Sequence, residues 1–162
     1  MKLLISDANI IIDIQAGNLI EVVFRLPETF AVPNILYEEE LRERHPELPG
    51  YGLQVLGISE AYVRETYRLR GQYSMPSQND LFALALAKQE HCPLLTGDRA
   101  LRAAAEREEV IVRGTLWLMD RLVAERLITV TALERAYDRM RQAGRRLPWN
   151  EVDRQLRHYR KR

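Results

Sequence analysis

The sequence has little cysteine, and this scarcity excludes whole classes of site. Its 162 residues include one cysteine, Cys92, so the chain has neither a disulfide framework nor a zinc site built from cysteine ligands. A chain of this length buries a substantial core without such supports. We therefore expect a domain held together by packing, in a reducing compartment, and we place the protein in the cytoplasm.

Long hydrophobic runs are also missing. No stretch approaches the roughly 20 apolar residues that a membrane-spanning helix needs. Asp7 and Asp13 interrupt the apolar N-terminal segment, and no small-residue cleavage site follows it. We therefore expect neither a signal peptide nor a membrane span. A hydrophobic share of 46% beside 29% charged residues is typical of a globular domain.

Net charge is nearly absent, but its distribution along the chain is uneven. The overall value is +1, from 24 basic and 23 acidic residues. The stretch 135–162 contains ten Lys and Arg against three Asp and Glu, a net +7, which leaves −6 for the rest of the chain. An acidic body with a basic tail suits a polyanionic ligand that also needs a cation at one place. A solvated helical face is the alternative for this tail.

Strand-like and helix-like segments alternate along most of the chain. Apolar runs predict strands at Leu3–Ser6, Thr29–Val32, Leu53–Ile58, Pro93–Thr96 and Val110–Val112. Helices are predicted between these strands, among them Asn34–Glu43, Asn79–Glu90 and Arg99–Glu108, and "PELPGYG" is expected to be a loop. After Gly114 every segment has helical periodicity.

This alternation predicts an α/β fold of three layers. We expect a central, mostly parallel sheet of about five strands with helices on both faces and extra helices at the C-terminus. We assign residues 1–128 to the main domain and residues 129–162 to a C-terminal helical extension packed on that domain.

Four acids occupy positions that this topology brings to one edge of the sheet. Asp7 directly follows the first strand, and Asp98 follows the fourth through a two-residue turn. Asp80 lies in the first turn of the preceding helix, and Glu39 lies one to two turns into the helix after the second strand. Ligands bind beyond the carboxyl ends of strands in such sheets. Carboxylates gathered there repel one another unless a cation such as Mg²⁺ or Mn²⁺ neutralises them.

Each acid also has a purely structural interpretation. Asp7 and Asp98 stand where they can cap the helices that follow them. Asp80 is the last residue of "SQND", which fits a capping box with Asp in place of Glu. Glu39 lies among the acids of "YEEEL", where an exposed carboxylate needs no further explanation.

The ordered set of these segments resembles the PIN domain family of metal-dependent ribonucleases, and most of all its VapC-toxin-like subgroup with an extended helical C-terminus. The matching stretches are "ISDANIII" (5–12), "VPNILYEEEL" (32–41), "SQNDLFALALA" (77–87) and "LLTGDRAL" (94–101). "GTLWLMDRLVAERLI" (114–128) resembles the helix that follows the last strand in that subgroup. The resemblance covers the chain to about Ile128 and continues more loosely beyond, and it implies a PIN-like fold.

The resemblance assigns roles to particular residues. It implies that the catalytic, metal-holding acids are, in order along the chain, Asp7, Glu39, Asp80 and Asp98. Asn9 and Thr96 match polar residues that support the family's site. Glu39 is preferred as the second acid because it follows Pro33 by six residues, the usual offset, while Glu40 remains the alternative. Leu101 and Arg102 stand where many members carry a further Asp or Asn, which argues against a strong second metal site.

The activity implied is hydrolysis of RNA by water activated on Mg²⁺ or Mn²⁺. Arg99 and Arg102, on the helix after Asp98, are candidates for holding substrate phosphates, and an ordinary exposed helical face is the alternative for both. The resemblance also implies an antitoxin partner and a homodimer, whose contact we expect around Trp117, Leu118 and Leu122.

Three other interpretations compete with a nuclease. A degenerate PIN-like module would bind RNA or a protein without cutting. A phosphatase of the haloacid dehalogenase type would need a second Asp where this chain has Asn9, together with a motif lysine that is not evident. A structural α/β adaptor is favoured only if the four acids are scattered in the fold.

Overall fold

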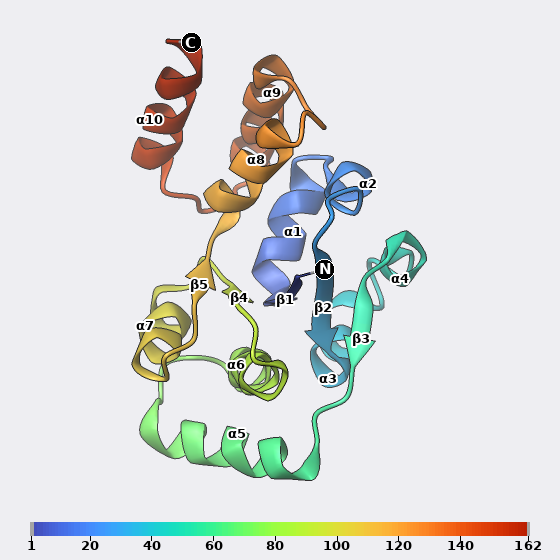
Figure 1. The fold of residues 1–162 in the computed structure, drawn as a ribbon, viewed down its shortest axis with the longest axis vertical. Helices are drawn as coiled ribbons and strands as arrows, with labels where there is room; N and C mark the ends of the chain where they lie inside the picture. The colour runs from blue at the N-terminus through green and yellow to red at the C-terminus, as the bar shows by residue number, and fades with distance from the viewer. Residues whose placement is uncertain (1, 162) are drawn as a thin grey trace.

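The computed structural model describes residues 2–161 and has a five-stranded parallel sheet at its centre (Figure 1). The strands are β1 (Leu3–Ser6), β2 (Thr29–Pro33), β3 (Gln54–Leu56), β4 (Leu94–Leu95) and β5 (Val112–Arg113). Their order is β3-β2-β1-β4-β5, and each neighbouring pair is parallel. The chain therefore winds away from β1 in both directions, and the crevice of such a sheet opens between β1 and β4.

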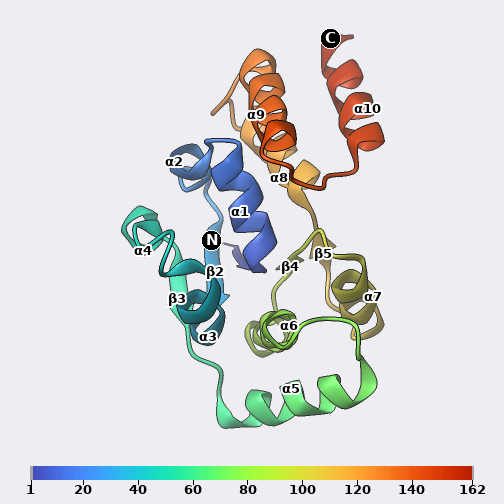
Figure 2. The ribbon, with the colours of Figure 1, turned by 180° about the vertical axis from the view of Figure 1, so that it is seen from behind.

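Helices cover both faces of this sheet and complete a three-layer α/β/α fold, as predicted. The helices are α1 (Ala8–Ala16), α2 (Ile20–Val23), α3 (Asn34–Leu36), α4 (Leu48–Tyr51), α5 (Glu60–Gln72), α6 (Gln78–Glu90), α7 (Arg99–Arg107), α8 (Thr115–Ala124), α9 (Val130–Gln142) and α10 (Trp149–Arg160). A π-helical turn, η1 (Tyr37–Leu41), continues α3. Figures 1 and 2 show α1 with α8 and α9 on one face, and α6 on the other with α5 outside it.

Helix α6 is enclosed by the sheet on one side and by α5 on the other. Its sequence explains this position, because consecutive residues from Ala83 to Ala87 are all buried. A helix that is apolar all round belongs inside a domain, and its alanines permit close approach to both neighbours. The packing fixes the first turn of α6, which carries Asp80, against the carboxyl ends of the strands.

The C-terminal helices pack on the α1 side of the fold. A Cβ added to Gly17, just after α1, would lie 2.7 Å from Met140 Cε and 3.5 Å from Ala136 Cβ, so α9 approaches α1 closely. Helix α10 buries Val152 and Leu156. These contacts place α9 against α1, and the division of the chain at residue 128 stays a prediction.

Several local predictions differ from the structure, and β4 and β5 also have other bounds than predicted. The predicted loop "PELPGYG" contains α4, because Leu48 is fully buried and holds this turn against the core. The helix predicted over Asn34–Glu43 changes to the wider π turn η1 after Leu36. The third strand is shorter than predicted and covers Gln54–Leu56. No helix within residues 2–161 is both long enough and apolar enough to cross a membrane.

Candidate active site

Asp7 is the most deeply buried acid of the candidate site. It directly follows β1 and is 0% exposed. Its Oδ1 accepts a hydrogen bond from the backbone N of Ile10 at 2.9 Å, which caps α1. Its Oδ2 accepts one from Thr96 Oγ1 at 2.5 Å. Burial raises the pKa of Asp7 to about 7, against the two hydrogen bonds, and the negative charge of Asp80 raises it further.

Asp80 is held by the capping box that the sequence predicted. Ser77 Oγ accepts from the backbone N of Asp80 at 3.1 Å, and Asp80 Oδ2 accepts from the backbone N of Ser77 at 3.1 Å. Partial burial raises the pKa of the Asp80 carboxyl, and the charge of Asp98 acts in the same direction. The charge of Asp98 therefore acts on Asp80, and the charge of Asp80 acts on Asp7.

Asp98 caps α7 and shares a partner with Asp7. Its Oδ1 accepts from the backbone N of Leu101 at 2.8 Å. Its own backbone N donates to Thr96 Oγ1 at 3.0 Å. The hydroxyl of Thr96 thus donates to one acid and accepts from the backbone of the other. The pairing of Ser6 with Leu95 places Asp7 and Thr96 side by side at the ends of β1 and β4.

All three of these acids accept hydrogen bonds within helix caps. Each cap uses one carboxylate oxygen and fixes the direction of the side chain. Within residues 2–161, Asp80 Oδ1 and Asp98 Oδ2 accept no hydrogen bond and remain able to bind a ligand. The structural interpretation of each acid is therefore correct, and the same caps fix the directions of the three side chains.

The second acid of the motif lies on the π turn η1. The turn is closed by a bond from the backbone N of Arg42 to the carbonyl of Tyr37 at 2.8 Å, five residues back. Asn79 Nδ2 donates to Glu39 Oε2 at 3.1 Å and to Glu40 Oε2 at 3.0 Å. Both acids therefore approach the start of α6, next to Asp80. Single π turns of this kind occur often at functional sites.

The two arginines predicted to bind substrate are both exposed, on the first turns of α7. A Cβ placed on Gly114 would lie 3.3 Å from Arg102 Nη2 and 3.7 Å from the carbonyl O of Thr96. The guanidinium of Arg102 therefore reaches across the carboxyl ends of β4 and β5. Arg99 stands directly after Asp98.

Three residues outside the predicted set belong to this region. Asn79 holds the two glutamates, and it immediately precedes Asp80 in "SQND". Asp13 is buried at 7% exposure and pairs with Arg145, whose Nε lies 2.6 Å from Asp13 Oδ1. Asn9 and Asp13 share one face of α1, four residues apart, which was an available signal. Arg145 had no local signal, because it approaches from the far end of the chain.

The donor set suits a hard divalent cation. Within residues 2–161, no three Asp, Glu, His or Cys side chains lie close enough together to form a ready-made ion site. Mg²⁺ does not need such a cage, because it binds through one or two carboxylates and completes its shell with waters and substrate phosphates. The oxygens of Asp80 and Asp98 that accept no hydrogen bond, beside the buried Asp7, meet this requirement.

Comparison with known proteins identifies the class. The sequence profile of the family described as the PIN domain matches residues 3–161. The chain therefore belongs to the PIN domain family, whose members are generally nucleases, and the resemblance drawn from the sequence motifs is confirmed at the level of this family. No curated protein matches the sequence.

One solved structure with a similar fold is VapBC2 from Rickettsia felis, bound to a DNA fragment from their promoter. It shares 16% sequence identity with this chain at a TM-score of 0.48. The alignment covers 69% of this chain and 98% of that one.

Proposed function

We propose that this protein is a metal-dependent endoribonuclease whose active site is formed by Asp7, Asp80 and Asp98 with Glu39. The observation that carries the proposal is the arrangement of the three aspartates. Each is fixed by a helix cap or a buried hydrogen bond at the carboxyl edge of the sheet. Burial raises the pKa of Asp7 and of Asp80, and charge adds to this, that of Asp80 acting on Asp7 and that of Asp98 acting on Asp80. A divalent cation relieves such repulsion.

The cation would be Mg²⁺ or Mn²⁺, held by one or two of the carboxylates of Asp7, Asp80 and Asp98, with waters completing its shell. When bound, it would supply an activated water and polarise the phosphoryl group. The side chains themselves supply orientation. Thr96 holds Asp7 Oδ2 through its hydroxyl, so that the ionised form of Asp7 keeps one direction. Asn79 keeps Glu39 and Glu40 close to Asp80.

Substrate phosphates would bind at the rim through Arg99 and Arg102. An acidic site repels an RNA backbone, so cations beside it are needed to hold the strand. Arg102 is the better placed of the two, because its guanidinium lies over Gly114 and the end of β4. Glu39 would orient a water or hold a second ion, with Glu40 as the alternative.

Cleavage of single-stranded RNA tests this function. Wild-type protein should cut RNA in Mg²⁺ or Mn²⁺ and should be inactive in EDTA. Asp7→Asn, Asp80→Asn and Asp98→Asn should each lose more than the roughly 10–100-fold typical of residues behind the metal ligands. Asp153→Asn, the same change on the exposed surface of α10, should retain full activity. Metal-independent cleavage, or full activity in all three site variants, would contradict the proposal. RNA binding without cleavage would favour the degenerate module.

The proposal extends to the protein's assembly and partners. We propose a homodimer and, as the toxin of a toxin–antitoxin pair, a complex with an antitoxin protein. Leu118 and Leu122 are fully buried within the chain, so they are unavailable for the dimer contact expected of them. Trp117 is partly exposed, with the guanidinium of Arg113 5.8 Å from its ring. Light scattering at low concentration should give twice the 18.9 kDa mass of the chain, and a monomeric mass would contradict the dimer.

A further inference from the structure

An arginine from the C-terminal extension lies on α1 beside the candidate active site. The loop between α9 and α10 passes alongside α8 and α1 (Figure 2) and carries Arg145. Arg145 Nε donates to Asp13 Oδ1 at 2.6 Å. Its Nη2 lies 3.4 Å from both the backbone O and the side-chain Oδ1 of Asn9. Asn9 is two residues after Asp7, so this guanidinium belongs to the neighbourhood of the first acid.

Asp13 serves to hold this arginine. It is 7% exposed, and its second oxygen, Oδ2, accepts from Thr115 Oγ1 at 3.1 Å. Both carboxylate oxygens are thereby occupied by protein donors. A buried carboxylate needs such partners, and Asp13 therefore fixes Arg145 in position.

The guanidinium is fixed on one side and open on the other. Among residues 2–161, Nη1 has no hydrogen-bond acceptor. The two contacts of Nη2 with Asn9 are long, and hydrogen bonds at such distances are weak. The side chain is 24% exposed. This arrangement leaves donors in a planar fork, the geometry that matches phosphate.

The position of the fork suits a phosphate next to the one that is cut. Along a helix that rises 1.5 Å per residue, Asn9 lies about 3 Å and Asp13 about 9 Å beyond Asp7. Arg145 spans these two positions. A strand that passes from Asp7 along α1 would therefore meet the guanidinium of Arg145 within about two turns of the helix.

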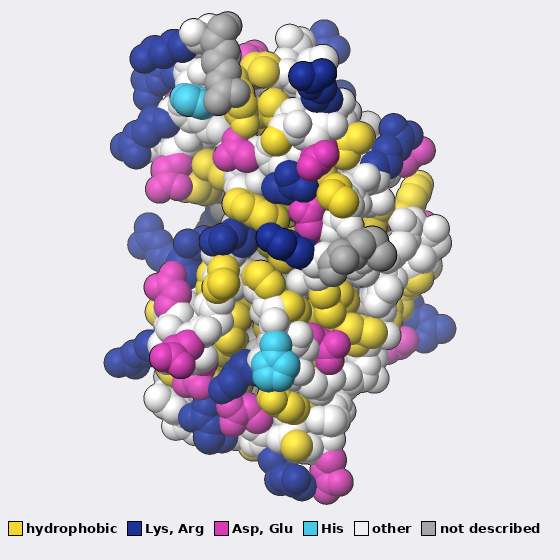
Figure 3. Space-filling model, viewed as in Figure 1, with side chains coloured by type: hydrophobic (Ala, Val, Ile, Leu, Met, Phe, Trp, Pro, Cys, Tyr) yellow, Lys and Arg dark blue, Asp and Glu magenta, His cyan; other side chains and the backbone are white. Residues whose placement is uncertain are grey.

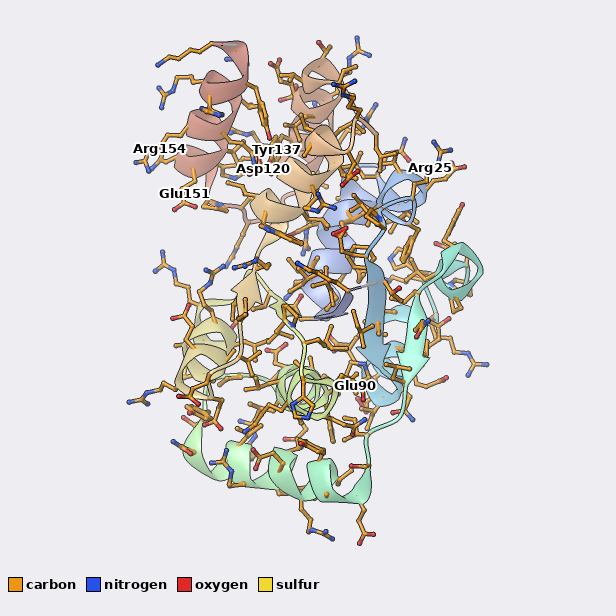
Figure 4. All side chains as sticks on the ribbon, viewed as in Figure 1. Arg25, Glu90, Asp120, Tyr137, Glu151 and Arg154 are labelled. Carbon is orange, nitrogen blue, oxygen red and sulfur yellow. The ribbon has the colours of Figure 1, made fainter. Side chains whose placement is uncertain are left out.

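Other basic residues of the extension are engaged elsewhere or face away. Arg141 stacks on Trp149, its guanidinium carbon 4.3 Å from the ring centre, and Arg160 pairs with Glu134 at 3.0 Å. Lys and Arg gather on the outer side of α10 (Figure 3), where Arg154 points away from the fold (Figure 4). Arg145, in contrast, lies on α1 through its contacts with Asp13 and Asn9.

We propose that Arg145 is a substrate-positioning residue that binds the phosphate adjacent to the cleaved one in a single-stranded RNA. The inference rests on the proposed nuclease function, since it takes Asp7 as the place of cleavage. It assigns the C-terminal extension a part in the substrate path. The opposing interpretation is that Arg145 and Asp13 only fasten the extension to α1.

Equilibrium binding of RNA separates these two interpretations. The measurement uses the full chain with Asp80→Asn, which keeps the RNA intact, and follows the dissociation constant over a range of salt concentrations. Adding Arg145→Gln should weaken binding roughly tenfold and reduce the log–log salt slope by about 0.7. Arg25→Gln, in the exposed turn that follows α2, should leave both values unchanged. An unchanged affinity and slope in folded Arg145→Gln would overturn the inference.

If Arg145→Gln does not fold, Arg145→Lys is the variant to measure in the same binding experiment. An ammonium can still pair with Asp13, so the melting temperature should stay close to that of the parent. It lacks the second arm of the fork, so RNA binding should still weaken. Parental affinity in this variant would show that the second arm of the guanidinium makes no contact with the RNA.

The two proposals can fail separately. If wild type cuts RNA and Arg145→Gln binds and cuts it equally well, the phosphate contact is refuted and the nuclease function stands. If RNA binding depends on Arg145 but the wild-type protein does not cut RNA, the nuclease function is refuted and the phosphate contact stands. A wild-type protein that neither binds nor cuts RNA refutes both.

Discussion

Thr96, directly after β4, is hydrogen-bonded to Asp7, directly after β1. Its Oγ1 donates to Asp7 Oδ2 across 2.5 Å and accepts from the backbone N of Asp98 at 3.0 Å. One hydroxyl therefore stabilises the ionised form of a fully buried carboxylate and also orders the turn into α7. The sequence resemblance had suggested a hydroxyl that supports the site, and the structure shows which two groups it contacts.

Removing this hydroxyl should destabilise the fold and raise the pKa of Asp7 further. Thr96→Val keeps the shape of the side chain but leaves the Asp7 oxygen and the Asp98 N–H without their partner, which costs roughly 1–3 kcal/mol for each unsatisfied group. Thr96→Ser keeps the hydroxyl and should cost much less. Chemical denaturation of both variants measures the difference. Equal stability of the two would contradict the role of the hydroxyl.

The stability of the metal-free protein should depend on the protonation of Asp7. The pKa of this group is about 7 in the fold against 3.8 ordinarily, so the folded state binds its proton more tightly. Its stabilising contribution is present below about pH 4 and is lost as the pH rises through about 7. The asparagine of Asp7→Asn cannot ionise, so this variant should not lose that stability as the pH rises.

Thermal melts in EDTA test this pH dependence. Relative to wild type, Asp7→Asn should gain stability between about pH 5 and pH 8. At the higher pH, Mg²⁺ or Mn²⁺ should raise the melting temperature of wild type by mass action and should not raise that of Asp7→Asn. The proposal would be contradicted if the melting temperatures of the two proteins changed with pH in the same way and the metal did not raise that of wild type.

Local patterns in the sequence predict much of this fold and part of its site. The strand ends and caps around Asp7, Asp80 and Asp98 were predictable, because capping depends on residues within three or four positions. The π turn was not, since it follows from how η1 packs and not from a spacing of "YEEEL". The pair formed by Asp13 and Arg145 joins residues 132 positions apart, a distance over which one sequence carries no periodic signal.

The last helix should prove necessary for folding. Val152 and Leu156 are buried, Tyr137 Oη donates to Gln155 Oε1 at 2.5 Å, and Gln155 Nε2 donates to the carbonyl of Leu116 at 2.9 Å. Deleting the chain from Trp149 onward should therefore destabilise the domain as well as weaken RNA binding.

Point substitutions in α10 give the sharper measurement. Leu156→Ala should lower the free energy of unfolding by about 2–3 kcal/mol. Arg154→Ala, on the outer side of the same helix (Figure 4), should change it by less than about 0.5 kcal/mol. Denaturant unfolding compares the two. A stable deletion protein, or a Leu156→Ala variant as stable as Arg154→Ala, would show that α10 is not part of the core.

The account depends above all on whether Asp7, Asp80 and Asp98 share a divalent ion. Crystals soaked in Mn²⁺, with data collected at a wavelength where manganese scatters anomalously, measure this directly. We predict an anomalous peak at the edge between β1 and β4, within bonding distance of carboxylate oxygens from at least two of the three aspartates. The peak should be absent from crystals of Asp80→Asn. A wild-type crystal with no peak at that edge, or with manganese bound only elsewhere, would contradict the metal-dependent nuclease.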